Sequence, residues 1–203
     1  AVALTPPGSP DLPMYLNNLG NGLSDRYART GELADLEQAI AHGQQAVALT
    51  PPGSPDLPMY LNNLGNGLRD RYARTGELAD LEQAIAHWQQ AVALTPPDSP
   101  ALPSRLNNLG IAYINSSKYD DAIAIYDQLI AHDPQYTNAY YNKACAYALM
   151  NDVPQACRWL RLAIQMDGET LDLARTDADF DAIRNTPEFQ AVLSSHASKD
   201  SQT

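Results

Sequence analysis

Apolar residues near the start of the chain recur at the spacing of a helix. One stripe is made of residues three or four positions apart: Leu16, Leu19, Leu23 and Tyr27. A second stripe follows between residues 33 and 49: Leu36, Ala39, Ile40, Ala46 and Val47. Thr30 and Gly31 separate the stripes as a helix stop and turn signal. The pattern predicts a helix hairpin, and no strands are expected because no segment alternates with period two.

The hairpin pattern is repeated along the chain. AVALTPPGSP at residue 1 recurs at residue 46 and, as AVALTPPDSP, at residue 91, which gives a period of 45 residues. Residues 1–45 and 46–90 differ only at Ser24 against Arg69 and at Gly43 against Trp88. The third copy keeps LNNLG at 106–110 and is shorter, and a weaker fourth unit occupies about 136–168.

Proline-rich loops separate the units. Three prolines within five residues, PPGSP or PPDSP, end each second helix. A serine followed by proline reads as a helix cap and a first-turn proline: Ser9-Pro10, Ser54-Pro55 and Ser99-Pro100. Pro13, Pro58 and Pro103 also fit near a first turn, which blurs where that helix begins. Gly43 stands where the second copy has Trp88. A glycine inside a helix costs about 1 kcal/mol relative to alanine. Either the first hairpin is looser or another residue fills the space, and we hypothesise that this hairpin is the least stable element.

The linked positions resemble the tetratricopeptide repeat over roughly residues 1–168. In the second unit the matching residues are Leu61, Leu64, Gly65, Leu68, Ala84, Trp88, Ala91 and Pro96. The third and fourth units carry related sets, with Lys143 where leucine is usual. The resemblance implies an all-α, tetratricopeptide-like α-solenoid, a right-handed superhelix of helix hairpins, with a helical C-terminal cap. Gly65 and Ala84 are the small pair that lets two helices approach closely.

The first two units are longer than the usual form of the repeat. Gly20 and Ala39, like Gly65 and Ala84, are 19 residues apart, whereas Gly110 and Ala122 are 12 apart. Seven extra residues amount to about two helical turns, so we expect the first two hairpins to be longer than the last two. Such units resemble kinesin light chain repeats and bacterial or fungal arrays found beside caspase-like or nucleotide-binding signalling domains.

The sequence is therefore expected to divide into seven parts. They are the end of a preceding repeat helix (1–7), long repeats 1 and 2 (8–52 and 53–97), repeats 3 and 4 (98–135 and 136–168), C-terminal capping helices (169–195) and a polar tail (196–203). Residues 176–193 resemble the end cap of bacterial arrays of this class. Since residues 1–5 read as the last turn of a helix, we expect an excerpt of a longer array with an uncapped N-terminal face.

Asparagines form a second face on the first helix of each unit, apart from the leucine stripe. In this family the first helices line a concave groove, so the resemblance implies a peptide-binding ladder. With Arg69, the one cation that could face the groove, its members are Asn17, Asn18, Asn21, Asn62, Asn63, Asn66, Asn107, Asn108 and Asn142. An amide both donates and accepts hydrogen bonds, which suits a peptide backbone. In the alternative interpretation these amides bond each other between repeats, and Arg69 is an ordinary surface arginine.

Other candidate chemistry is weak. His42 and His87 lie on different repeats without a nearby partner, so no metal site is expected. Cys145 and Cys157 are expected to be buried thiols. Asp177, Asp179 and Asp181 lack the glycine and terminal glutamate of a calcium loop and are better explained by helix capping and solvation. Catalytic and nucleotide-binding motifs are missing, so we expect no enzyme and no cofactor. The carboxylate clamp of the family is not expected either, because its basic residues are missing.

Charge and composition narrow the partners. The chain has 13 Lys and Arg against 24 Asp and Glu, a net charge of −11, which argues against binding nucleic acid. No apolar run approaches the ~18 residues that a membrane span needs. With 2 Cys in 203 residues a disulfide scaffold is not expected, so a reducing, cytoplasmic setting is the default.

The sequence thus predicts a non-enzymatic protein–protein interaction scaffold that binds a peptide or helix in the groove of the first helices. Two alternatives stay open. The chain could be a regulatory repeat segment of a larger signalling or protease protein, bacterial arrays included. It could also be a self-assembling module that pairs through its uncapped N-terminal face.

Overall fold

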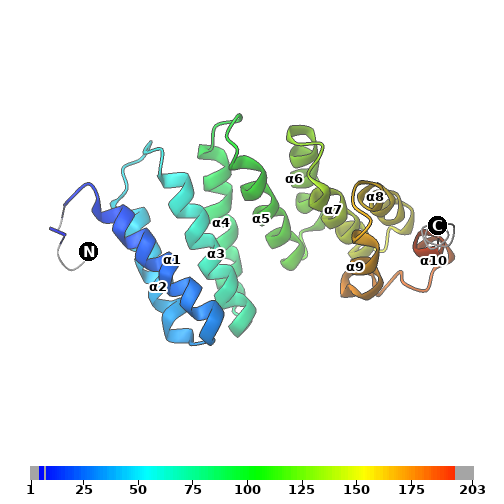
Figure 1. The fold of residues 1–203 in the computed structure, drawn as a ribbon, viewed down its shortest axis with the longest axis horizontal. Coiled ribbons are helices and arrows are strands. Elements are labelled where there is room, and N and C mark those ends of the chain that lie inside the picture. The colour runs from blue at the N-terminus through cyan, green and yellow to red at the C-terminus, as the bar shows by residue number, and fades with distance from the viewer. Residues whose placement is uncertain (1–4, 7, 195–203) are drawn as a thin grey trace, which may run out of the picture. The chain divides into compact units, whose positions relative to one another are not determined.

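The computed structural model describes residues 5, 6 and 8–194, and within these residues it contains helices and no strands (Figure 1). The chain forms two compact units, Ala1–Arg105 and Leu106–Thr203, called unit 1 and unit 2 below. The α-helices are α1 (Leu12–Thr30), α2 (Leu33–Leu49), α3 (Leu57–Thr75), α4 (Leu78–Leu94), α5 (Leu102–Asn115), α6 (Tyr119–His132), α7 (Thr137–Leu149), α8 (Val153–Met166), α9 (Thr170–Thr176) and α10 (Pro187–Ser194). The all-α prediction is confirmed. Most of the expected first segment, 1–7, and all of the polar tail, 196–203, lie outside the described residues.

Helix lengths agree with the prediction that the first two hairpins are longer than the last two. The first four helices have 19, 17, 19 and 17 residues, whereas α5, α6, α7 and α8 have 14, 14, 13 and 14. In unit 1, α1 and α2 form one hairpin and α3 and α4 the next, with α2 packed on α3 (Figure 1). Gly31 and Gly76 end the first helices with φ of +73° and +76°, a left-handed conformation that glycine adopts without strain.

The predicted start of the first helices is wrong by a few residues. Ser9 lies in a turn, where its side-chain oxygen accepts from the backbone N–H of Asp11 at 3.3 Å, and α1 begins only at Leu12. Pro13 is therefore the first-turn proline, in place of Pro10. The same shift occurs at α3, where Pro58 takes this position. Proline fits there because the first-turn N–H groups of a helix have no partner within the helix.

Gly65 of α3 and Gly110 of α5 each lie against an aromatic ring of the following helix. A Cβ added to Gly65 would be 2.8 Å from the indole of Trp88, and one added to Gly110 would be 2.6 Å from the ring of Tyr126. The first hairpin has no such aromatic residue, and a Cβ added to Gly20 would instead lie 3.1 Å from the backbone carbonyl oxygen of Ala39. The close approach expected between helices is thus present, and the atoms nearest to a Cβ on Gly65 belong to Trp88.

Leu64 fills the space that Gly43 leaves. A Cβ added to Gly43 would lie 3.3 Å from Cδ1 of Leu64, and the cavity remaining between them and their neighbours has a volume of only about 10 Å³. The sequence left open whether the first hairpin is looser or another residue fills the space at Gly43. The structure supports the second possibility, with Leu64 as that residue.

The predicted stripe of α1 is only partly buried. Leu16 and Leu23 are buried, whereas Leu19 is 40 % exposed. In α3 the equivalent Leu64 is 2 % exposed, since α2 covers it. The stripe of α2 is buried as predicted at Leu36, Ala39, Ile40 and Ala46.

Each hairpin of unit 1 is also tied by an ion pair. Arg71 of α3 donates to both carboxylate oxygens of Asp80 in α4, through Nε at 2.7 Å and Nη2 at 2.6 Å. Arg26 of α1 holds Asp35 of α2 in the same way. This bidentate pairing lowers the pKa of Asp35, first through the hydrogen bond that Arg26 donates.

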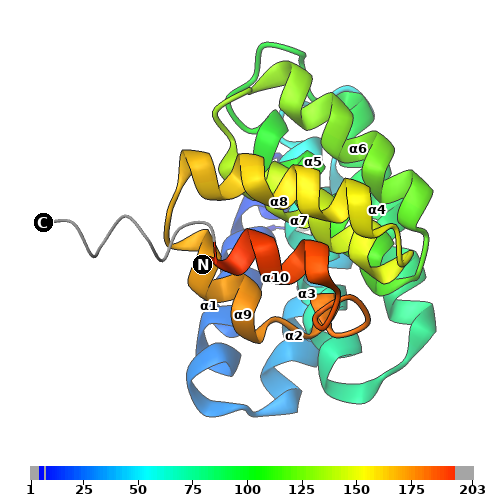
Figure 2. The same cartoon turned by 90° about the vertical axis from the view of Figure 1, so that its right-hand side faces the viewer.

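Unit 2 ends in the short helices expected as a cap. α9, the 3-10 helix η2 (Ala178–Phe180) and α10 follow α8, and α10 packs against α8 (Figure 2). Phe180, Ile183, Phe189 and Val192 are fully buried in the core that they share with α7 and α8. Lys143, where the family usually has leucine, is 3 % exposed; its ammonium group pairs with Asp127 and lies 3.7 Å above the centre of the Trp159 ring.

Candidate functional site

Four of the predicted asparagines form two hydrogen-bonded pairs, each between consecutive first helices. In unit 1, Nδ2 of Asn63 donates to Oδ1 of Asn17 at 3.0 Å, which joins α3 to α1. In unit 2, Asn142 of α7 donates to Asn107 of α5 at 3.1 Å. Asn17 is 4 % exposed, so its amide is occupied inside the molecule. These four side chains therefore hold adjacent repeats in register, as the alternative interpretation expected.

A polar cavity lies between α1 and α3 on the side of the remaining unit 1 asparagines. Its volume is about 470 Å³, within the range of small-molecule sites. The cavity brings together Asn21, Asn63, Asn66 and Arg69 of the predicted set. The other members do not line the cavity. Asn17 and Asn62 belong to α1 and α3 but are not among the lining residues, and Asn18 is exposed. The remaining three belong to unit 2: Asn107, Asn108 and Asn142.

The charges of this cavity come from two equivalent positions that differ by one substitution. In α3, Arg69 donates to Oδ1 of Asp70 through Nη2 at 2.8 Å and Nε at 3.0 Å. In α1 the equivalent carboxylate, Asp25, follows Ser24 in place of an arginine. Arg69 is thus held by its neighbour along the helix and neutralises Asp70. The cavity carries two carboxylates and one guanidinium, so its net charge is negative.

The site predicted from the sequence omitted several lining residues. Ser24, Asp25 and Asp70 lie on the same helices as the asparagines but carry no distinguishing signal, because polar and charged residues on a helix surface are common. Ala28 and Gly67 were not recognised at all. Their place in the lining depends on the spacing between α1 and α3, which no residue pattern reveals.

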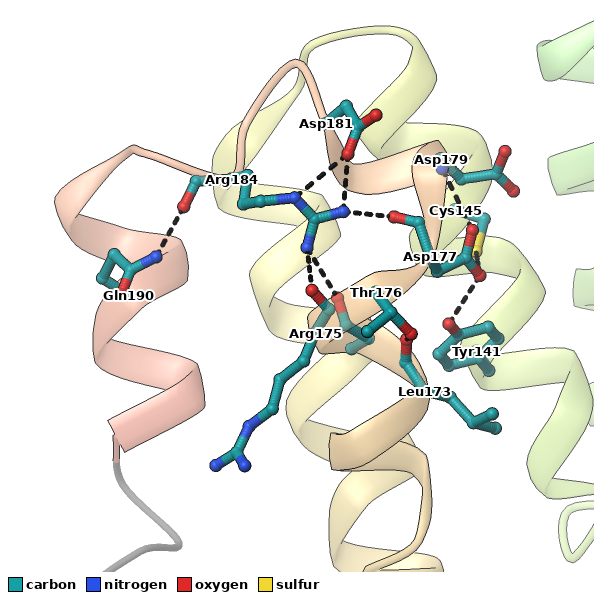
Figure 3. Close-up of polar contacts among 11 residues, drawn as sticks. Tyr141, Cys145, Leu173, Arg175, Thr176, Asp177, Asp179, Asp181, Arg184 and Gln190 are labelled. Atoms are coloured by element: carbon teal, nitrogen blue, oxygen red, sulfur yellow. Dashed lines mark hydrogen bonds and ion pairs between the residues drawn. The ribbon is translucent and has the colours of Figure 1, made fainter.

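A second polar group lies in unit 2, where α7 meets η2 (Figure 3). The Sγ of Cys145 and carboxylate oxygens of Asp177 and Asp179 lie within 4.8 Å of one another. Burial raises the pKa of the Cys145 thiol well above its usual range, and burial together with Asp177 raises the pKa of Asp179. The thiol of Cys145 therefore stays protonated at neutral pH, and a protonated thiol is a poor metal ligand.

Hydrogen bonds of Asp177 explain that group structurally. Its carboxylate accepts the hydroxyl of Tyr141 at 2.6 Å and the backbone N–H of Asp179 at 3.0 Å, so it fastens η2 to α7 (Figure 3). The predicted capping role of Asp177 is confirmed. Nearby, Arg184 donates to the carbonyl oxygens of Ala174, Arg175 and Asp177 and to Asp181, which closes the end of α9. Cys145 and Cys157 are both free and buried.

Comparison with known proteins agrees with this architecture. The tetratricopeptide repeat family matches residues 59–101 and 107–169, together more than half of the chain. A search among curated proteins finds no match. Among the described residues, none of the helices combines the length and the apolar character that a membrane span requires.

Solved structures of similar fold are also repeat proteins. A protein of the kinesin light chain type with nearly identical TPR-like repeats, from Podosopora anserina, has a TM-score of 0.66 at 18% identity, over 94% of this chain and 99% of that one. BtubC from P. vanneervenii has a TM-score of 0.65 at 15% identity, over 94% and 84%. MamA residues 41 to the end, from Desulfovibrio magneticus RS-1, has 0.59 at 19%, over 91% and 97%. These likenesses concern the fold.

The chain belongs to the tetratricopeptide repeat family, and its fold is an all-α, tetratricopeptide-like solenoid. Repeats of this kind support a protein–protein interaction scaffold in general terms.

Proposed function

We propose that this scaffold binds an extended peptide in the cavity between α1 and α3. The observation that carries the proposal is the polar cavity of about 470 Å³ lined by Asn21, Asn63 and Asn66. A side-chain amide can both donate and accept hydrogen bonds, which complements a peptide backbone. Asn63 already donates one hydrogen bond to Asn17, so it has less to offer a peptide than Asn21. Hydrogen bonds of this type supply orientation along the groove without demanding one particular sequence.

The charges of the cavity indicate which side chain the peptide brings. Asp70 already accepts hydrogen bonds from Arg69, whereas Asp25 has serine as its neighbour. A lysine or arginine of the peptide would meet Asp25 with complementary charge, and the net charge of −11 on the chain adds a weak long-range attraction. We therefore propose a peptide that carries a basic residue. Asn18, Asn62 and Asn108 stay predicted contacts outside this cavity.

The test uses Ser24 and Arg69, the residues at which α1 and α3 differ. Short peptides selected from a random displayed library against the full chain serve as the probe, and calorimetry gives the dissociation constant. Ser24→Arg gives Asp25 the neighbour that Asp70 has, and should weaken binding by up to about fivefold, since an exposed ion pair is worth up to about 1 kcal/mol. Arg69→Ser releases Asp70 and should strengthen binding by a similar factor.

Asparagine variants separate this cavity from the ladder as a whole. Asn21→Ala and Asn66→Ala should each weaken the selected peptide. Asn18→Ala tests a predicted contact outside the cavity, and Asn138→Ala, at an exposed asparagine of α7 outside the predicted set, serves as the matched control. Peptides without basic residues, or affinities that none of these substitutions changes, would place binding elsewhere. The role as a regulatory segment of a larger signalling or protease protein stays a prediction that this test leaves aside.

A further inference from the structure

Two exposed methionines lie on the same face of α1 and α3 as the polar cavity. Met14 is seven residues before Asn21 in α1. Met59 is likewise seven residues before Asn66 in α3. Seven residues make nearly two turns of an α-helix, so each methionine lies in line with an asparagine of the cavity, about 10 Å away along the axis. Met14 is 41 % exposed and Met59 is 40 % exposed.

The hydrogen bond between Asn63 and Asn17 places the two methionines beside each other. Asn63 donates to Asn17 at 3.0 Å, so α1 and α3 meet at these two residues. Met14 precedes Asn17 by three residues. Met59 precedes Asn63 by four residues. Both spacings place side chains one turn apart on one helix face. The methionines therefore lie together on one side of the asparagine pair, and the cavity begins at Asn63 and extends the other way.

Among the described residues of unit 1, no other large and exposed apolar side chain lies on this face. Leu19 is exposed, but it is two positions from Asn21 and so lies on the opposite side of α1. The other exposed leucines of the unit belong to second helices: Leu49, Leu78 and Leu94. In α5 the position of Met59 is taken by Ser104, so the methionine pair is confined to α1 and α3.

We propose that the peptide in the cavity continues along α1 and α3 and lays an apolar side chain on Met14 and Met59. The inference rests on the proposed function, which supplies the peptide and its basic residue at Asp25. Methionine suits this contact because its unbranched, polarizable side chain adapts to apolar groups of different shape. Covering the two exposed methionines removes apolar surface from water, which stabilises the complex.

The helix geometry sets the distance between the apolar and the basic residue of the peptide. Met14 and Asp25 are 11 positions apart in α1, which is about 16 Å along the axis at 1.5 Å per residue. An extended peptide advances about 3.3 Å per residue. The two peptide residues are therefore about five positions apart. The partner is thus a segment with one apolar and one basic residue at this spacing, and charge alone does not define it.

Substitution by glutamine tests the apolar contact, because glutamine keeps the length and helix preference of methionine and replaces its apolar end by an amide. Peptides selected from a random displayed library against the full chain are the probe, and calorimetry gives the dissociation constant. The chain with both Met14→Gln and Met59→Gln should bind the selected peptide about tenfold more weakly. Met150→Gln is the matched control, since Met150 is 42 % exposed but lies at the end of α7 in unit 2.

A change in the peptide tests the same contact from the other side. Serine replaces the apolar residue that lies about five positions from the basic one. On the unchanged chain this serine peptide should bind about tenfold more weakly than its parent, a result that does not depend on how the glutamine chain folds. The serine peptide should bind the unchanged and the glutamine chain equally, because the contact has already been removed. Circular dichroism shows whether the glutamine chain is helical.

The outcomes separate this inference from the proposed function. Selected peptides without an apolar residue at this spacing, or equal binding of the parent peptide to the unchanged and a helical glutamine chain, would overturn the inference. The proposed function would still stand if Asn21→Ala and Asn66→Ala weakened the same peptide. Weaker binding to the glutamine chain without an effect of these asparagine variants would remove the peptide from the cavity and overturn both. A library that yields no binder would also overturn both.

Discussion

Leu19 and Leu64 occupy the same place in two nearly identical helices, but only Leu64 lies beneath α2. The energetic role of a side chain in this array thus depends on whether the neighbouring repeat covers it. The same holds for Gly22, which has open space beside it, and Gly67, which faces Ile40.

This difference in burial predicts that the same leucine-to-alanine substitution lowers the free energy of unfolding by different amounts at the two positions. Leu64→Ala should lower the free energy of unfolding by about 2–5 kcal/mol, the usual range for a buried leucine. Leu19→Ala should cost less than about 1 kcal/mol, because the side chain has not left water completely. Urea unfolding followed by circular dichroism measures both, and each variant is the control for the other. Equal losses in the free energy of unfolding would contradict the burial of Leu64 beneath α2.

The Arg26–Asp35 pair predicts a dependence of stability on pH. Because Arg26 lowers the pKa of Asp35 in the folded chain, the unfolded chain binds more protons between the folded and the ordinary unfolded pKa. The pair therefore contributes its stability above about pH 4, the ordinary Asp range, and loses it as the pH falls further.

Asp35→Asn should accordingly destabilise the chain at neutral pH and make less difference at about pH 3. Urea unfolding at both pH values measures the effect, with the exposed Glu82→Gln as the control. A destabilisation of Asp35→Asn that is as large in acid as at neutral pH would show that the charge of Asp35 is not the cause.

At the scale of helices, the sequence predicts what depends on neighbours along the chain. The extent of the second helix, the stop at Gly31 and the longer first hairpins follow from local spacing and turn chemistry. The start at Leu12 does not, because Ser9 can cap a helix or a turn equally well. The burial of Asn17 and the contact of Gly43 with Leu64 could not be predicted from the sequence either, since they depend on the distances between α1, α2 and α3.

The first hairpin remains our candidate for the least stable element, for a reason sharper than its glycine. Leu64 fills the space at Gly43, so the weakness lies instead in the uncovered face of α1. Amide hydrogen exchange should show faster exchange in the middle of α1 than at the equivalent amides of α3. The near identity of the two helices makes intrinsic exchange rates a built-in control. Equal protection of α1 and α3 would refute the hypothesis.

At the scale of the whole molecule, membership of the tetratricopeptide repeat family explains the repeated hairpins and supports a scaffold for protein partners. The sequence correctly singled out the polar face of the first helices. It could not separate the amides that only join repeats, such as Asn142 with Asn107, from those that face a cavity, such as Asn21. Both kinds share the same residue type and helical spacing, and only the helix geometry tells them apart.

A peptide that occupies the cavity between α1 and α3 would lie against side-chain amides, and these amides can report its binding directly. Nitrogen-15 spectra of the full chain should be recorded with and without the selected basic peptide. We expect the side-chain NH₂ signals of Asn21 and Asn66 to shift, while those of Asn107 and Asn142 stay in place. Unchanged Asn21 and Asn66 signals at saturating peptide would contradict the proposed site.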